Sequence, residues 1–162
     1  MKSLNIFFYV GLTIVAALVL SILPLPIFMS EIWPACLLVV VVYWIMALPQ
    51  SIGLWTAWLC GLSLDVLQDT LLGEHALGFL FVAILVRLFY RQLRMYSRLQ
   101  QSIIIFVIIL GFQSLMAFIN ALAGRGPQVF LFWLVPFSSM LLWPLLFVIL
   151  RDYRRRFVIS SK

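Results

Sequence analysis

The sequence is short of charged residues, and this scarcity limits the class of protein that it can encode. Only 10% of its 162 residues are Asp, Glu, Lys or Arg, whereas 65% are hydrophobic. Soluble domains are closer to about a quarter charged and half apolar. The composition therefore excludes an ordinary soluble domain. It predicts an all-α polytopic membrane protein in which residues 1–162 form a single integral membrane domain.

Residues that carry out catalysis are equally scarce. The chain has two cysteines and one histidine. Nucleophilic catalysis needs a Ser or Cys side chain within reach of a base, and the sequence offers no such pairing. It also lacks a glycine-rich loop suited to phosphate, so we expect neither enzymatic activity nor a cofactor. Cys36 and Cys60 lie within apolar runs and are expected to be buried rather than to form a disulfide or bind a metal.

Six apolar runs are candidate transmembrane helices. They cover residues 6–23, 33–48, 53–68, 76–89, 102–123 and 129–150. Several are shorter than the ~20 residues that a helix needs to cross hydrocarbon. The run at 53–68 also fits a segment that dips into the membrane and returns.

The placement of basic residues decides between these two interpretations. The net charge of +6 comes from basic residues at the ends of apolar runs, which is typical of membrane orientation signals rather than of nucleic-acid binding. With six spans and the N-terminus inside, ten of the eleven Lys and Arg residues fall on the cytoplasmic side. If 53–68 returned to its side of entry, Lys2 and the later arginines would fall on opposite sides. We therefore predict six spans with both termini cytoplasmic.

The stretch from Gly61 to Gly73 brings polar residues into this apolar sequence. A carboxylate at the bilayer centre costs roughly 3 kcal/mol, so Asp65 should face other helices. Gly61 lies one turn earlier on the same helical face, and Gln68 lies about one turn later. We predict that the stretch is the packing face of a central span, because a small residue lets another helix approach. The alternative is that Asp65 handles a ligand or a proton.

A polar turn follows this stretch and contains Asp69, Glu74 and His75. Together with Asp65, these residues include types that ligate zinc. A single histidine with loosely spaced acids is nevertheless more typical of a solvated turn, and we expect a turn without a metal.

Two other spans carry small or polar residues. A stripe of small residues recurs at every fourth position of the first span and predicts a helix contact. Its members are Thr13, Ala17 and Ser21. Gln113 and Asn120 lie near one face of the fifth span. With Asp65, they are the polar residues that a small-molecule cavity between the helices would use.

Arginines gather after the fourth span, at positions 87, 91, 94 and 98, with further arginines in the C-terminal tail. A spacing of three or four residues would place Arg87, Arg91, Arg94 and Arg98 along one helical side. They are expected at the inner end of any span, where each contributes about 1 kcal/mol of attraction to anionic lipids. The alternative is that they form a docking edge for a cytoplasmic partner.

Three stretches of the chain resemble the MreD family of bacterial rod-shape-determining proteins. They are Tyr43–Pro49, the segment Gly61–Gly73 running on to Leu77, and Leu142–Pro144 with the basic tail up to Phe157. The resemblance covers essentially the whole chain. Gly61, Asp65 and Gly73 match recurrent residues of the family's central motif, whereas Asp69 stands where relatives often carry a small residue.

The resemblance implies a multi-pass protein of the bacterial inner membrane that works in the machinery building lateral peptidoglycan. Its implied partners are MreC, bound within the membrane, and through it MreB, the glycosyltransferase RodA and the elongation transpeptidase. The implied fold is similar to the substrate-binding subunits of energy-coupling-factor transporters. We therefore expect a non-enzymatic scaffold that also contacts membrane lipids. A small-molecule binding or transport subunit is the alternative.

Overall fold

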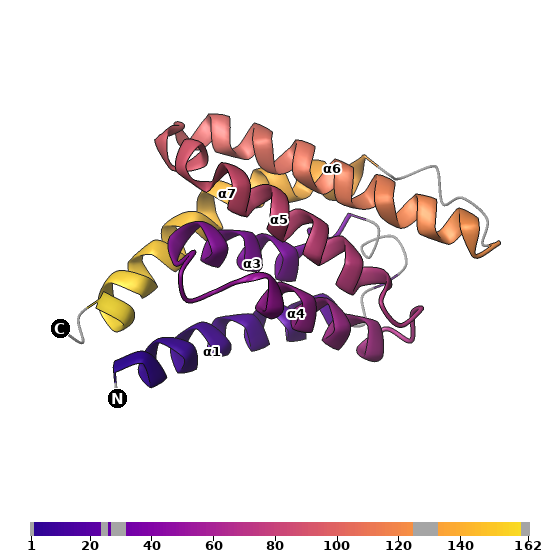
Figure 1. Ribbon diagram of the computed structural model, residues 1–162. Coiled ribbons are helices and arrows are strands. Elements are labelled where there is room, and N and C mark those ends of the chain that lie inside the picture. Colours follow the sequence, from indigo (N-terminus) through magenta and orange to yellow (C-terminus); the bar gives the residue numbers. More distant parts are fainter. Residues whose placement is uncertain (1, 24–25, 27–31, 125–132, 160–162) are drawn as a thin grey trace.

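The computed structural model describes residues 2–23, 26, 32–124 and 133–159. Within them lie six α-helices and a terminal π-helical turn (Figure 1). These are α1 (Lys2–Ile22), α3 (Cys36–Ala47), α4 (Leu54–Leu67), α5 (Glu74–Met95), α6 (Arg98–Leu122), α7 (Leu134–Tyr153) and η1 (Arg154–Ile159). Each α-helix overlaps one predicted apolar run, so the all-helical prediction is confirmed for the described residues.

Helix length separates these elements into two groups. Three helical stretches are long and apolar enough to cross a membrane, namely Glu74–Met95, Arg98–Leu122 and Leu134–Arg156. α3 and α4 are shorter, with 12 and 14 residues, and the apolar part of α1 is Ile6–Ile22. Six helices are therefore present among the described residues, and length together with hydropathy identifies three of them as candidate membrane crossings.

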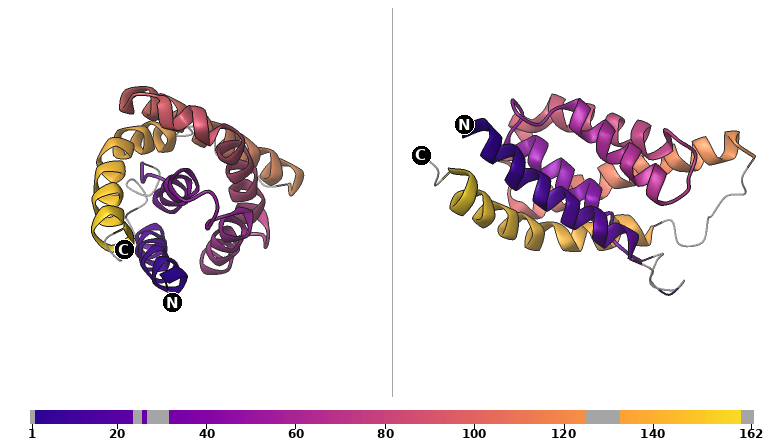
Figure 2. Two further views of the ribbon diagram at one scale, coloured as in Figure 1. Left: turned by 60° about the vertical axis from the view of Figure 1, so that its left-hand side comes forward. Right: turned by 90° about the horizontal axis from the view of Figure 1, so that it is seen from below.

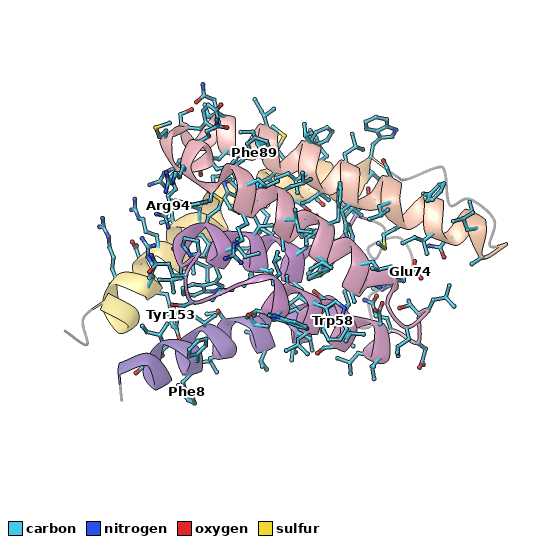
Figure 3. The ribbon with its side chains drawn as sticks, viewed as in Figure 1. Phe8, Trp58, Glu74, Phe89, Arg94 and Tyr153 are labelled. Carbon is cyan, nitrogen blue, oxygen red and sulfur yellow. The ribbon has the colours of Figure 1, made fainter. Side chains whose placement is uncertain are left out.

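Successive helices run in alternate directions, so the described ends of α1 and η1 lie at the same end of the bundle (Figure 1). This end also carries Arg94 and Tyr153, and Glu74 lies at the opposite end (Figure 3). We call them the basic end and the hairpin end, because the second contains the tight connection between α4 and α5.

The central helix is α3, which the other helices surround when the bundle is viewed along its length (Figure 2, left). All residues from Cys36 to Met46 are buried. A helix that is hydrophobic on every side is typical of a protein core or a membrane span, and α3 packs against α1, α5 and α7. The predicted helix contact of the first span is confirmed. Ala17 is buried, and the Thr13 hydroxyl accepts a 2.8 Å hydrogen bond from the Trp44 indole of α3.

The arginine-rich region is divided between two helices. α5 ends at Met95, and Ser97 begins a new helix through a capping box in which Ser97 and Gln100 satisfy each other's backbone N–H groups. The prediction of four arginines along one helical side is therefore wrong for Arg98, which belongs to α6. The spacing of the arginines does not show where α5 ends and α6 begins. The signal for that boundary is the Ser97 capping box, which lies between Arg94 and Arg98.

Candidate functional site

Asp65 lies in the last turn of α4 and binds the beginning of α5. Its side chain is fully buried. Oδ2 accepts from the backbone N–H groups of Gly73 at 2.9 Å and Ala76 at 3.3 Å. Oδ1 accepts from the His75 N–H at 2.8 Å and the Thr70 hydroxyl at 3.0 Å, and His75 Nδ1 lies 2.9 Å away. We call this set of contacts the carboxylate clamp.

The clamp has a clear electrostatic cause. The first N–H groups of a helix have no partner within that helix, and they form the positive end of its dipole. Asp65 supplies the negative charge and the acceptors from the neighbouring helix, so it caps α5 across the hairpin. The carboxylate therefore faces other helices, as predicted. It lies at the hairpin end, however, and not midway along the span as its apolar flanks suggested.

Two glycines make the clamp possible. A Cβ atom on Gly61 would lie 2.5 Å from Ala76 Cα and 2.7 Å from the His75 carbonyl oxygen, so α4 and α5 meet backbone to backbone. Gly73 has a φ of 101°, a conformation that residues with a side chain rarely adopt. Gly61 and Asp65 share the predicted packing face. Gln68 does not belong to it, because its side chain is exposed and its amide lies 3.5 Å from the Ser21 carbonyl oxygen.

The prediction of a solvated turn at Glu74 and His75 is wrong. α5 already begins at Glu74, so both residues are held in the packed first turn of the helix. Glu74 is buried, and its Oε1 accepts a 2.6 Å hydrogen bond from Asn120 of α6. The His75 side chain is only 17% exposed. Together with the clamp, these contacts join α4, α5 and α6 at the hairpin end.

The structure gives no support to a metal site or to the predicted polar cavity. Among the described residues, no three His, Cys, Asp or Glu side chains are placed to hold a metal ion. Asp65, Gln113 and Asn120 do not converge: the first is in the clamp, the last binds Glu74, and the Gln113 Oε1 is buried without a hydrogen-bond partner in the described part of the chain.

A cavity does lie near the hairpin end, in a different place. Its volume is about 300 Å³, and its described lining includes Leu38, Gln68, His75, Phe79 and Phe112. The bond between His75 Nδ1 and Asp65 fixes the orientation of the imidazole. Because a carboxylate only accepts hydrogen bonds, it favours a ring proton on Nδ1.

At the basic end, Arg94 has an internal role. Its guanidinium donates to the Met46 carbonyl and, at 2.9 Å, to the Ala47 carbonyl. These carbonyls end α3, where a cation also complements the helix dipole. Arg94 therefore caps the central helix, and only part of the predicted docking edge remains available.

The other three arginines of that edge differ in their surroundings. Arg87 and Arg91 are exposed on α5, and the described bond of Arg91 goes to the adjacent Tyr90 hydroxyl. Arg98 lies over the Phe147 ring of α7, with 5.4 Å between the guanidinium carbon and the ring centroid. Arg87 and Arg91 are thus the members that a partner would meet first.

Sequence reasoning missed a second polar connection, which joins three helices near the basic end. Gln101 is buried at the start of α6, and its amide donates to the Leu93 carbonyl of α5 at 2.9 Å. Its side-chain oxygen accepts from the Trp143 indole of α7 at 3.3 Å. The Ser97 capping box was a usable signal, because it places Gln101 within the first turns of a helix.

Comparison with known proteins settles the family. The family model described as rod shape-determining protein MreD matches residues 1–153. The chain is also 30% identical over 145 residues to the rod shape-determining protein MreD of Haemophilus influenzae, which covers 88% of each chain. The chain belongs to the MreD family. No solved structure matches it. Membership gives this membrane protein a role in cell shape, in a family not known for enzymatic activity.

The three stretches that carried the resemblance have different positions in this MreD-family chain. Tyr43 and Trp44 belong to the enclosed helix α3. The segment Gly61–Gly73 forms one side of the carboxylate clamp. Trp143, fully buried in α7, binds Gln101. The first and third stretches meet at the basic end, where Arg154 Nη1 lies 3.5 Å from the Ala47 carbonyl oxygen, whereas the second lies at the hairpin end.

Proposed function

We propose that the chain is a non-enzymatic inner-membrane scaffold of the machinery that builds lateral peptidoglycan. In this role it binds MreC within the membrane and couples it to MreB, RodA and the elongation transpeptidase. The observation that carries the proposal is that the polar side chains at the hairpin end bind one another, as in the clamp and the Glu74–Asn120 bond. What the molecule offers to partners is its apolar helix faces and its arginines.

The proposed topology has six spans and cytoplasmic termini. Alternation of the helices brings the described ends of α1 and η1 to the same end of the bundle as the end of α5 and the start of α6, which is consistent with the positive-inside rule (Figure 1). The short helix α3 is enclosed by other helices, so it does not need to match the bilayer thickness by itself. Reporter proteins fused to either terminus should both give cytoplasmic signals. A periplasmic signal from the C-terminal fusion would contradict the topology.

For cytoplasmic contact we propose the exposed pair Arg87 and Arg91. A double Arg87→Gln, Arg91→Gln variant should still insert in the membrane but should recover less of its partners in co-purification from mild detergent. The matched control is Arg155→Gln with Arg156→Gln, which removes two exposed charges from the tail. Unchanged recovery of MreC and the associated synthase with the first variant would remove this assignment.

A second candidate function is small-molecule binding, and the cavity beside His75 favours it. An apolar pocket with a few convergent polar groups is the usual form of a ligand site. The expected ligand has an apolar body and a polar group directed at the His75 imidazole. Mass spectrometry of the purified protein should then detect a co-purifying compound that is lost on Phe79→Trp substitution, which would fill the cavity. If no compound is found, the scaffold remains the supported function.

A further inference from the structure

Three buried polar atoms at the basic end have no hydrogen-bond partner among the described residues. They are the Tyr43 hydroxyl oxygen and the Nε atoms of Arg151 and Arg154. Tyr43 belongs to α3 and is 2% exposed. Arg151 lies in the last turn of α7, and Arg154 is the first residue of η1. Buried polar groups without partners are uncommon, and such groups indicate a missing ligand or strain.

The ends of α3 and α7 bring these side chains into one region. Ala47 follows Tyr43 by one helical turn, and Arg151 follows Phe147 by one turn. The Tyr43 ring lies edge-on to Phe147 of α7, with centroids 5.5 Å apart. Arg154 Nη1 lies 3.5 Å from the Ala47 carbonyl oxygen, so it adds little to the capping of α3 that Arg94 already provides.

Positive charge is in excess at this place. The carboxylate in reach is Asp152, which lies 3.6 Å from Arg151 Nε and is 54% exposed. Arg98 approaches from α6, over the same Phe147 ring. A guanidinium group presents its N–H donors as a planar fork that suits a phosphate, and a phenol adds one more donor. An anion with several oxygens would therefore accept from the three donor atoms that have no hydrogen-bond partner among the described residues.

We propose that Tyr43, Arg151 and Arg154 form a binding site for the phosphate of an anionic phospholipid. A lipid fits better than an acidic protein segment because the two arginines end a helical stretch, Leu134–Arg156, that is long and apolar enough to cross a membrane. Basic residues at the end of such a span lie at the depth of the lipid headgroups. Basic pockets between helices on the cytoplasmic side of a membrane bind such headgroups.

The test uses the full chain purified in mild detergent, with native mass spectrometry to measure binding of phosphatidylglycerol against zwitterionic phosphatidylethanolamine. Arg154→Gln should weaken phosphatidylglycerol binding about tenfold, the effect of losing one hydrogen bond to a charged group. Tyr43→Phe should weaken it severalfold. Arg155→Gln is the matched control, because it removes an equal charge from the exposed neighbouring position and should leave binding unchanged.

Each other outcome overturns the proposal. Equal losses with Arg154→Gln and Arg155→Gln would indicate general charge attraction. Equal binding of the two lipids, or inorganic phosphate competing as strongly as the lipid, would exclude a lipid site. Preferential binding of an acidic peptide would identify a protein interface instead. If Arg154→Gln does not fold, Arg154→Lys keeps the charge but loses the fork, and it should still bind phosphatidylglycerol more weakly than the unmodified chain.

Discussion

The two ends of the bundle treat their polar groups in opposite ways. At the hairpin end, each Asp65 oxygen accepts at least two hydrogen bonds, and Glu74 binds Asn120. At the basic end, the Tyr43 hydroxyl and the Nε atoms of Arg151 and Arg154 are buried without a hydrogen-bond partner in the described part of the chain. The comparison indicates that polar groups at the hairpin end mainly bind one another and hold the helices together. At the basic end, some donor groups are still able to bind other molecules.

The largest effect is expected from Asp65→Ala, which removes the acceptor of the carboxylate clamp and so tests whether the hairpin end holds the helices together. The substitution leaves the N–H groups that begin α5 buried without an acceptor, and loss of one member of a buried charged network costs about 3–5 kcal/mol. Thermal unfolding in detergent and the amount of protein in membranes should both fall. Asp69→Ala is the control, because Asp69 is exposed in the same hairpin. Equal stability of the two variants would show that the clamp does not hold α4 to α5.

A smaller loss of stability is expected from Gly61→Ala, which tests the close approach of α4 and α5 at the hairpin end. The new methyl group would lie 2.5 Å from Ala76 Cα, and overpacking of this kind costs about 1–3 kcal/mol. Gly11→Ala in α1 is the control, because a Cβ there meets nothing within 4 Å and alanine favours a helix. The melting temperature should fall for the first variant and hold or rise for the second. The reverse order would contradict the observed contact.

The smallest effect in this series is expected from Arg94→Gln, and it tests the arginine that caps α3. Loss of the cap on α3 should lower the free energy of unfolding by about 1 kcal/mol. Arg91→Gln removes the same charge one turn earlier, where it makes no described contact with another helix, and should leave stability unchanged. If both variants unfold at the same temperature, Arg94 is not a cap.

Helical periodicity was sufficient to place Gly61 and Asp65 on one packed face, because residues four apart in a helix share a side. It failed for Gln68, since α4 ends at Leu67 and the rule no longer applies beyond the last turn. The same rule failed for Arg98, because a new helix begins after Ser97. Gln68 and Arg98 were misplaced because each lies beyond a helix boundary, where the 3.6-residue periodicity no longer applies.

By itself, the sequence determined the class of protein, the positions of the helices and the family, since long apolar runs and their basic flanks depend only on composition and order. The tertiary structure alone decided what the charged residues do. Glu74 is buried rather than solvated, His75 is largely covered and bound to Asp65, and Arg94 caps a helix rather than lying free. The physical reason is that a charge is stabilised by the groups that surround it. Those groups come from helices distant in the chain.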